Sequence, residues 1–130
     1  MSDPKPIKMG YEGQAAQQQV KLGDCLWEAH SAGSRILEFT AGRTFADYAE
    51  SEVLRAVVAK MLEIVGSALE EMQALYPEQA VRIEHLAEAV GLKQRLAGEV
   101  EDKVIWGFVE TTLPPLVAEV AVLLDEWHQE

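Results

Sequence analysis

Apolar residues recur at three- and four-residue steps along most of the chain, which is the period of an amphipathic α-helix. The clearest pattern predicts a long core helix from Glu52 to Leu75, with Ser51 as its N-cap and Tyr76-Pro77 as its end. Its recurring apolar positions are Leu54, Val57, Val58, Met61, Leu62, Val65, Ala68, Leu69, Met72 and Leu75.

Two further helices are predicted before this one. The first runs from about Ala15 to Phe39, and Gly42 suits its C-cap. Its expected inner face consists of Val20, Cys25, Leu26, Ala29, Ile36 and Leu37. A short helix then runs to about Tyr48, and it opens with Thr44 and Asp47 at the spacing of a capping box.

Two more helical regions follow the core helix. One extends from about Ile83 to Leu96, with Leu86, Ala89 and Val90 inward. The last extends from about Glu101 to Trp127, and Pro114-Pro115 predicts either a kink or two abutting helices within it.

No segment alternates as a strand does, so the predicted fold is all-α, a four- to five-helix up-and-down bundle. Residues 1–13 lack periodicity and contain two prolines and two glycines, which predicts a flexible tail. Residues 14–130 form the single predicted helical domain, and a chain of 130 residues can bury a core without metals or disulfides.

The charge balance argues against nucleic-acid binding. The chain has 22 acidic and 11 basic residues, for a net charge of −11. From Ala97 to the end there are eight acidic residues and only one basic residue, Lys103. Binding to a phosphate backbone requires the opposite balance, so RNA binding is doubtful. The simpler interpretation of the acidity is that it keeps the protein in solution.

The remaining composition indicates a cytoplasmic protein. Cys25 is the only cysteine, so no internal disulfide can form, as expected in a reducing compartment. The first residues show no apolar run of a signal peptide. No apolar stretch reaches about 18 residues, so no membrane-spanning helix is expected.

Three pairs of stretches, in order, resemble the HepT-like toxin family of the HEPN superfamily, and together they cover about residues 20–126. They are Leu26–Ala29 with Arg35–Gly42, Arg55–Val58 with Leu62–Gly66, and Val104–Trp106 with Leu113–Leu116. The resemblance implies a HEPN-like helical bundle that forms a homodimer, commonly a ribonuclease. It also implies a small nucleotidyltransferase antitoxin of the MNT type as the partner.

The family's ribonuclease motif is an Arg, four residues, a His, one residue and a Tyr. Such side chains clamp the phosphate and move protons near neutral pH. In the matching region here, Lys93 stands for the Arg, Gly98 for the His and Val100 for the Tyr. Arg95 lies nearby. The motif is therefore degenerate, with no confident catalytic residue, and ribonuclease activity is expected to be absent.

For the other candidate residues, a structural role is a simpler interpretation than a catalytic or metal-binding role. His85 is more simply a surface or capped histidine than a ligand or base. Asp125 and His128, one helical turn apart, suit a frayed terminus better than a metal site. Cys25 is expected to be a buried, inert thiol. We expect no cofactor and no metal.

The basic residues nearest the family's cleft are Arg35, Arg55, Lys60, Lys93 and Arg95, and ion pairs with surplus carboxylates are the expected role. Trp106 and Phe108 are predicted to lie either in the core or in a dimer interface.

These observations leave three functional hypotheses for the chain. The first is a HepT-like protein without ribonuclease activity that acts through protein binding in a toxin–antitoxin-type setting. The second is an active HEPN ribonuclease toxin whose rearranged motif uses Lys93 and Arg95. The third is an unrelated helical interaction module.

Overall fold

The computed structural model describes residues 5–129, with side chains from Val20 to Gln129, and all its regular elements are helical. The elements are α1 (Lys5–Thr40), α2 (Phe45–Glu50), α3 (Glu52–Leu75), α4 (Pro77–Ala80), α5 (Leu86–Arg95), α6 (Asp102–Gly107), the π-helical η1 (Phe108–Thr112) and α7 (Leu113–Gln129). The all-α prediction is confirmed, since residues 5–129 contain no strand.

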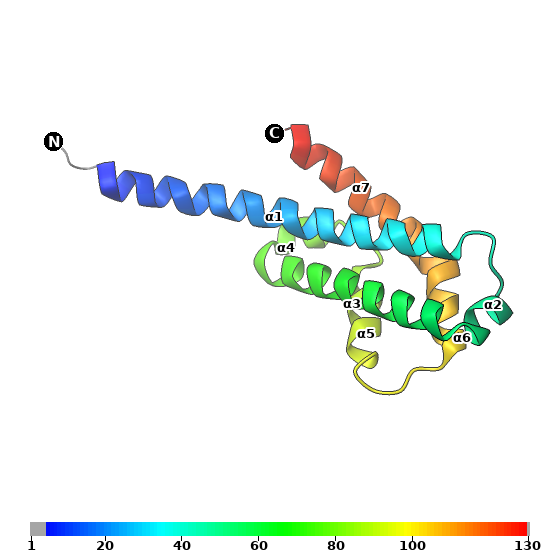
Figure 1. Ribbon diagram of the computed structural model, residues 1–130. Helices are drawn as coiled ribbons and strands as arrows, with labels where there is room; N and C mark the ends of the chain where they lie inside the picture. Colours follow the sequence, from blue (N-terminus) through cyan, green and yellow to red (C-terminus); the bar gives the residue numbers. More distant parts are fainter. Residues whose placement is uncertain (1–4, 130) are drawn as a thin grey trace.

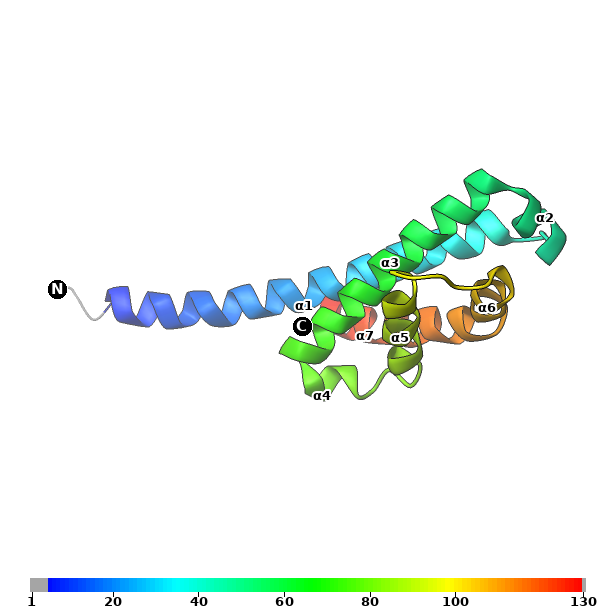
Figure 2. The same cartoon turned by 90° about the horizontal axis from the view of Figure 1, so that it is seen from below.

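Helices α1 and α3 run antiparallel, and α7 crosses α1 on its other side (Figure 1). Helix α5 packs against α3, and the short α2 and α6 meet at the far end of the bundle (Figures 1 and 2). The N-terminal part of α1 extends beyond the other helices in both views. The packed body is therefore formed by the C-terminal part of α1 with the helices that follow it.

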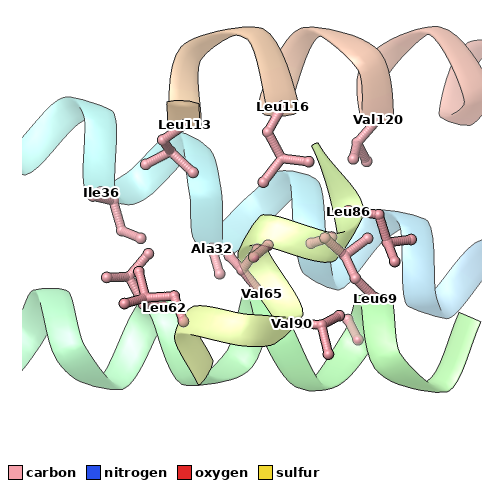
Figure 3. Packing of buried hydrophobic residues seen from close by; sticks show 14 of the residues in the cluster. Ala32, Ile36, Leu62, Val65, Leu69, Leu86, Val90, Leu113, Leu116 and Val120 are labelled. Carbon is pink, nitrogen blue, oxygen red and sulfur yellow. The ribbon is translucent and has the colours of Figure 1, made fainter. Parts of the chain in front are cut away.

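The core lies where α1, α3, α5 and α7 face one another (Figure 3). Ile36 of α1, Leu69 of α3 and Leu113 of α7 have no exposed surface. Leu86 and Val90 of α5 close the core from the side (Figure 3). Removing apolar surface from water in this way is the main stabilising contribution to such a fold.

The central helix α3 matches its predicted bounds. The Ser51 hydroxyl accepts a hydrogen bond from the Leu54 N–H at 3.1 Å, as an N-cap does. Most of its predicted apolar positions are buried, but Leu75 is 49% exposed because it lies at the helix end. The capping box ahead of α2 is also confirmed, with Thr44 and Asp47 bonded in both directions.

Helix α1 begins at Lys5, not at the predicted Ala15, so helical backbone covers residues 5–13 of the predicted tail. Pro6 falls in the first turn, where its missing N–H interrupts no intrahelical bond. The first four residues of that prediction lie outside the described residues. Within α1, Val20 was wrongly placed on the inner face, since it is 57% exposed. Gly42 ends the helix with a φ of +74°, as its predicted role as a C-cap requires.

Gly23 and Gly33, which lower helix propensity, allow α7 to approach α1 closely. A Cβ at Gly23 would lie 2.4 Å from the ring of Trp127, and one at Gly33 would lie 2.7 Å from a methyl carbon of Val117. Both separations are shorter than van der Waals contact, so any larger residue at either position would require the α7 side chain to move.

The last helical region continues through Pro114-Pro115 by way of η1. Neither proline has an N–H to donate, and the Leu113 N–H instead bonds to the Phe108 carbonyl, five residues earlier. The Thr111 hydroxyl donates to the Gly107 carbonyl at 2.7 Å. As predicted, the region is interrupted: α6 and α7 abut through a π-helical turn that ends just before the two prolines.

The expectation that no segment is apolar enough to span a membrane needs correction. The continuous helical stretch Asp102–Gln129 reaches a mean hydropathy of 1.5 over 18 residues, of which 33% are buried. Core helices pass the same test of length and composition. Here Leu113, Leu116 and Val120 of the stretch face α1 and α3 in the core.

Candidate functional site

The region that resembles the ribonuclease motif lies at the C-terminal end of α5, where α5 crosses α3. Lys93 packs its stem directly on Gly66 of α3, where a Cβ would lie 2.3 Å from Lys93 Cβ and 3.2 Å from the carbonyl oxygen of Ala89. The close approach of the two helices fixes the first part of the Lys93 side chain against α3.

The charge of Lys93 is paired within the chain. Its Nζ lies 2.8 Å from Oε1 of Glu70, and Nε2 of Gln94 donates to Oε2 of Glu70 at 3.4 Å. These hydrogen bonds hold the pKa of Glu70 below its usual value. Lys93, the residue in the phosphate-clamp position of the motif, is thus directed to a carboxylate on α3.

Arg95 and Gly98 lie in the turn that ends α5. The Gly98 N–H donates to the Arg95 carbonyl at 3.0 Å, and both residues are exposed. A Cβ at Gly98 would contact only that carbonyl, at 3.8 Å, so the position has room for a side chain but has none. Lys93, Arg95 and Gly98 therefore share one helix end, yet it carries no group that can transfer a proton near neutral pH.

Trp106 belongs to the core of a single chain. It is 6% exposed, and its ring lies 5.2 Å, centroid to centroid, from that of Tyr48 on α2. Burial raises the pKa of Tyr48 to about 12. Phe108, in η1, is half-buried against the same core. Of the two predicted roles, core packing accounts for Trp106.

The other basic residues are spread over the surface. Arg55 donates to the carbonyl of Ala49 at the α2–α3 junction. Lys60 lies 3.5 Å from Glu63 in an exposed ion pair on α3. Arg35, on α1, is exposed at the edge of a groove. They do not converge with Lys93 into one cationic pocket.

A groove of about 480 Å³ runs between α1 and α3. Its lining combines apolar and charged side chains: Trp27, Glu28, Ser31, Ala32, Arg35, Lys60, Met61, Glu63, Ile64 and Ser67. Trp27 is 58% exposed, which is unusual for so large an apolar side chain. Exposed aromatic residues beside polar ones are typical of protein-binding surfaces. The sequence alone did not single out this groove, because it depends on how α1 and α3 pair.

His85, the N-cap residue of α5, is bound by a carboxylate from α7. Oε2 of Glu119 lies 2.7 Å from Nδ1 of His85, and Oε1 accepts from the His85 backbone N–H at 3.2 Å. The hydrogen bond to Glu119 raises the pKa of His85. Arg82, three residues earlier, makes a bidentate ion pair with Glu126 of α7, both bonds being 2.8 Å. The segment before α5 is thus attached to α7 at two points.

Glu84, His85 and Glu119 are the one group of potential metal ligands in the described part of the chain. Their ligand atoms lie within 4.8 Å of one another. Asp125 and His128 are exposed near the end of α7 and lie outside this group. Glu119 was missed from sequence because it lies 34 residues from His85.

Cys25 is buried, as predicted, and faces Glu71 at 3.7 Å. Desolvation by burial, with the negative charge of Glu71, raises its pKa to about 12. A thiol with so high a pKa is neutral near pH 7 and is a poor nucleophile.

Comparison with known proteins finds no matching family model, no matching curated protein and no matching solved structure. The resemblance to HepT-like proteins therefore rests on the residues quoted above.

Proposed function

We propose that this protein is a HepT-like helical protein of the HEPN superfamily that lacks ribonuclease activity and acts by binding another protein in a toxin–antitoxin-type setting. The observation that carries the proposal is the state of the degenerate motif. Lys93 is paired with Glu70, and Gly98 offers no side chain where the family has a histidine. Proton transfer by a positioned group contributes roughly 10²–10⁴ in rate, and this contribution is missing.

The charge of the protein gives independent support. A net charge of −11 repels RNA most strongly at low salt, where a nucleic-acid binder is tightest. A lysine is also a poor substitute for an arginine that grips a phosphate through two parallel hydrogen bonds.

The groove between α1 and α3 supports the binding role. It lies on the surface between two helices, and Trp27 presents a large apolar side chain to solvent beside polar ones, as protein-binding surfaces do. As partners we propose a second copy of the chain and a nucleotidyltransferase of the MNT type, in the cytoplasm. Val122, 53% exposed on α7, is a further apolar contact available to a partner.

A ribonuclease that uses a rearranged motif is the alternative with an observation in its favour. Arg95 is exposed at the helix end and makes none of the ion pairs found among the described residues. Two copies of this helix end, brought together in a dimer, would present two such cations to RNA.

An RNA-cleavage assay separates these functions. Purified protein is incubated with a mixed RNA pool at low salt, beside a Lys93→Ala, Arg95→Ala double variant. We expect no cleavage by either protein. Cleavage by the wild type that is lost in the double variant would establish the alternative and refute the proposal.

The binding role is tested separately by light scattering. The chain alone should show about twice its mass of 14.4 kDa. Addition of an MNT-type nucleotidyltransferase should produce a larger complex, which Trp27→Ala should weaken and Val53→Ala should not. Both side chains are exposed, so neither change should alter the fold. A monomer that forms no complex would contradict the binding role.

A further inference from the structure

Two carboxylates lie within 3.8 Å of the imidazole nitrogens of His85, and Arg82, the nearest basic residue in the sequence, is already paired. Glu119 reaches the ring from α7, whereas Glu84 and Glu88 flank it along the chain, and all three act electrostatically on the ring. Arg82 is occupied by both carboxylate oxygens of Glu126. This excess of negative charge around a nitrogen ligand favours a cation.

Glu119 also determines which ring nitrogen is available. It accepts hydrogen bonds from both the backbone N–H and Nδ1 of His85, so the neutral ring carries its proton on Nδ1 and a lone pair on Nε2. A carboxylate that orients a histidine in this way is the usual second partner of a histidine that binds a metal through its other nitrogen.

The opposite side of the ring has the spacing of two ligands on one ion. Nε2 of His85 lies 3.8 Å from Oε2 of Glu84, which is too long for a direct hydrogen bond. Zinc–nitrogen and zinc–oxygen bonds of about 2.0–2.2 Å at a tetrahedral angle place two ligand atoms roughly 3.3–3.6 Å apart. The observed separation is slightly longer, and a small rotation of the exposed Glu84 side chain would close the difference.

We propose that Nε2 of His85 and the carboxylate of Glu84 bind a divalent transition-metal ion, with Zn²⁺ the best chemical match, while Glu119 orients the imidazole. Water fills the remaining coordination positions, because Glu84 is on the surface and no other potential ligand in the described chain joins the group. An imidazole ligand selects Zn²⁺, Ni²⁺ or Cu²⁺ over Mg²⁺ and Ca²⁺, which prefer oxygen.

The site is independent of the proposed function. An ion bound at His85 would lie at the start of α5, in the segment that Arg82 and His85 attach to α7. It would stabilise this attachment and would neither create nor require a nuclease centre.

The test is calorimetric titration of the EDTA-treated full chain with Zn²⁺ at pH 7.5. We expect one ion per chain for the wild type, and no displacement of it by excess Mg²⁺. His85→Asn should abolish binding, and asparagine preserves an N-cap at this position. Glu84→Gln should weaken binding at least tenfold, and Glu119→Gln should weaken it by roughly 10–100-fold. His128→Asn is the matched control and should change nothing.

Circular dichroism of each variant shows whether its helical fold is intact. The Glu84→Gln change is at an exposed position and should leave the fold intact even if the other changes do not. The ¹⁵N signals of the His85 ring provide a second readout, since Zn²⁺ should shift Nε2 and leave Nδ1 protonated. No saturable binding by the wild type, or binding that survives both His85→Asn and Glu84→Gln, would overturn the proposal.

Discussion

Helix α3 and the helical stretch Asp102–Gln129 are similar in length, yet the two are built differently. The first is a continuous α-helix of 24 residues with no proline. The second has 28 residues and passes through three elements, α6, η1 and α7. Both bury apolar residues on the face that points into the bundle.

The origin of the difference is Pro114-Pro115. In α3 every residue after the first turn can donate its N–H to a carbonyl four residues back. In the second stretch, the two prolines have no N–H to donate to the carbonyls of Glu110 and Thr111. The π-helical turn precedes the prolines, within it the Thr111 hydroxyl donates to the Gly107 carbonyl, and the chain remains helical.

Apolar periodicity therefore predicts which face of a helix is buried, but it does not predict how the backbone passes an interruption. A proline pair signals a disturbance, and the buried residues Val109, Leu113 and Leu116 show that the chain keeps its apolar side toward the core across it.

The largest expected effect tests the inner face of α3. Leu62→Ala removes a side chain that is 3% exposed and should lower the free energy of unfolding by about 2–5 kcal/mol, measured by urea denaturation. Val53→Ala, at a 74% exposed position on the same helix, is the control and should change it by less than about 0.5 kcal/mol. A loss below about 1 kcal/mol at Leu62 would mean that periodicity placed this face wrongly.

Much of the fold was predictable because its signals are local. The capping box joins Thr44 to Asp47, and the N-cap joins Ser51 to Leu54, each over three residues. Such patterns can be identified from the sequence without knowledge of tertiary structure. The short α4 was missed because Tyr76-Pro77 indicates an end, whereas a proline is equally suited to start the next helix.

The site could not be predicted to the same extent, because its partners are distant in sequence. Lys93 pairs with Glu70 across 23 residues, and His85 with Glu119 across 34. Any of the many carboxylates was an equally plausible partner before α3, α5 and α7 were placed together. The sequence did indicate that His85 was a surface or capped histidine and that the Lys93 region lacked a catalytic histidine, but it could not identify the residues that bind His85 or Lys93.

The second prediction concerns glycines, which helix propensity treats only as a cost. Alanine should stabilise a helix by about 1 kcal/mol relative to glycine. At Gly66, however, the new Cβ would lie 2.3 Å from Lys93 Cβ, and the α3–α5 contact must open. Gly66→Ala should therefore destabilise the protein by about 1–3 kcal/mol in urea denaturation.

Gly23→Ala provides the comparison within the helix pair formed by α1 and α7. Its Cβ would meet the ring of Trp127, a half-buried side chain near the C-terminal end of α7, which can shift more easily than the stem of Lys93 beside its backbone. The loss should be smaller than at Gly66. If Gly66→Ala stabilised the protein, the close approach of α3 and α5 would be wrong.

The third prediction compares the N-cap of α3 with the N-cap of α6, where the helical stretch Asp102–Gln129 begins. Ser51 caps α3 with its side chain, whereas Glu101, at the N-cap of α6, makes no such bond. Ser51→Ala should lower the free energy of unfolding by about 0.5–2 kcal/mol. Glu101→Ala should change it by less than about 0.5 kcal/mol. Equal losses from the two changes would show that the start of α3 does not depend on this cap.

The smallest effect should appear in the pH dependence of stability, at the capping box that Thr44 and Asp47 form ahead of α2. Hydrogen bonds from the backbone N–H and side chain of Thr44 hold the pKa of Asp47 below its usual value. A carboxyl group with a lowered pKa in the folded state stabilises the fold above its unfolded pKa of about 4, and it loses this effect as the pH falls through the folded pKa. Acid should therefore weaken the capping box ahead of α2 and α3.

Asp47→Ala should lower the melting temperature at pH 7, and the difference from the wild type should shrink when both proteins are melted below the folded pKa. Since Glu101 makes no cap, Glu101→Ala should show no matching convergence. A difference at Asp47 that stays constant with pH would mean that the carboxylate charge does not contribute to the cap.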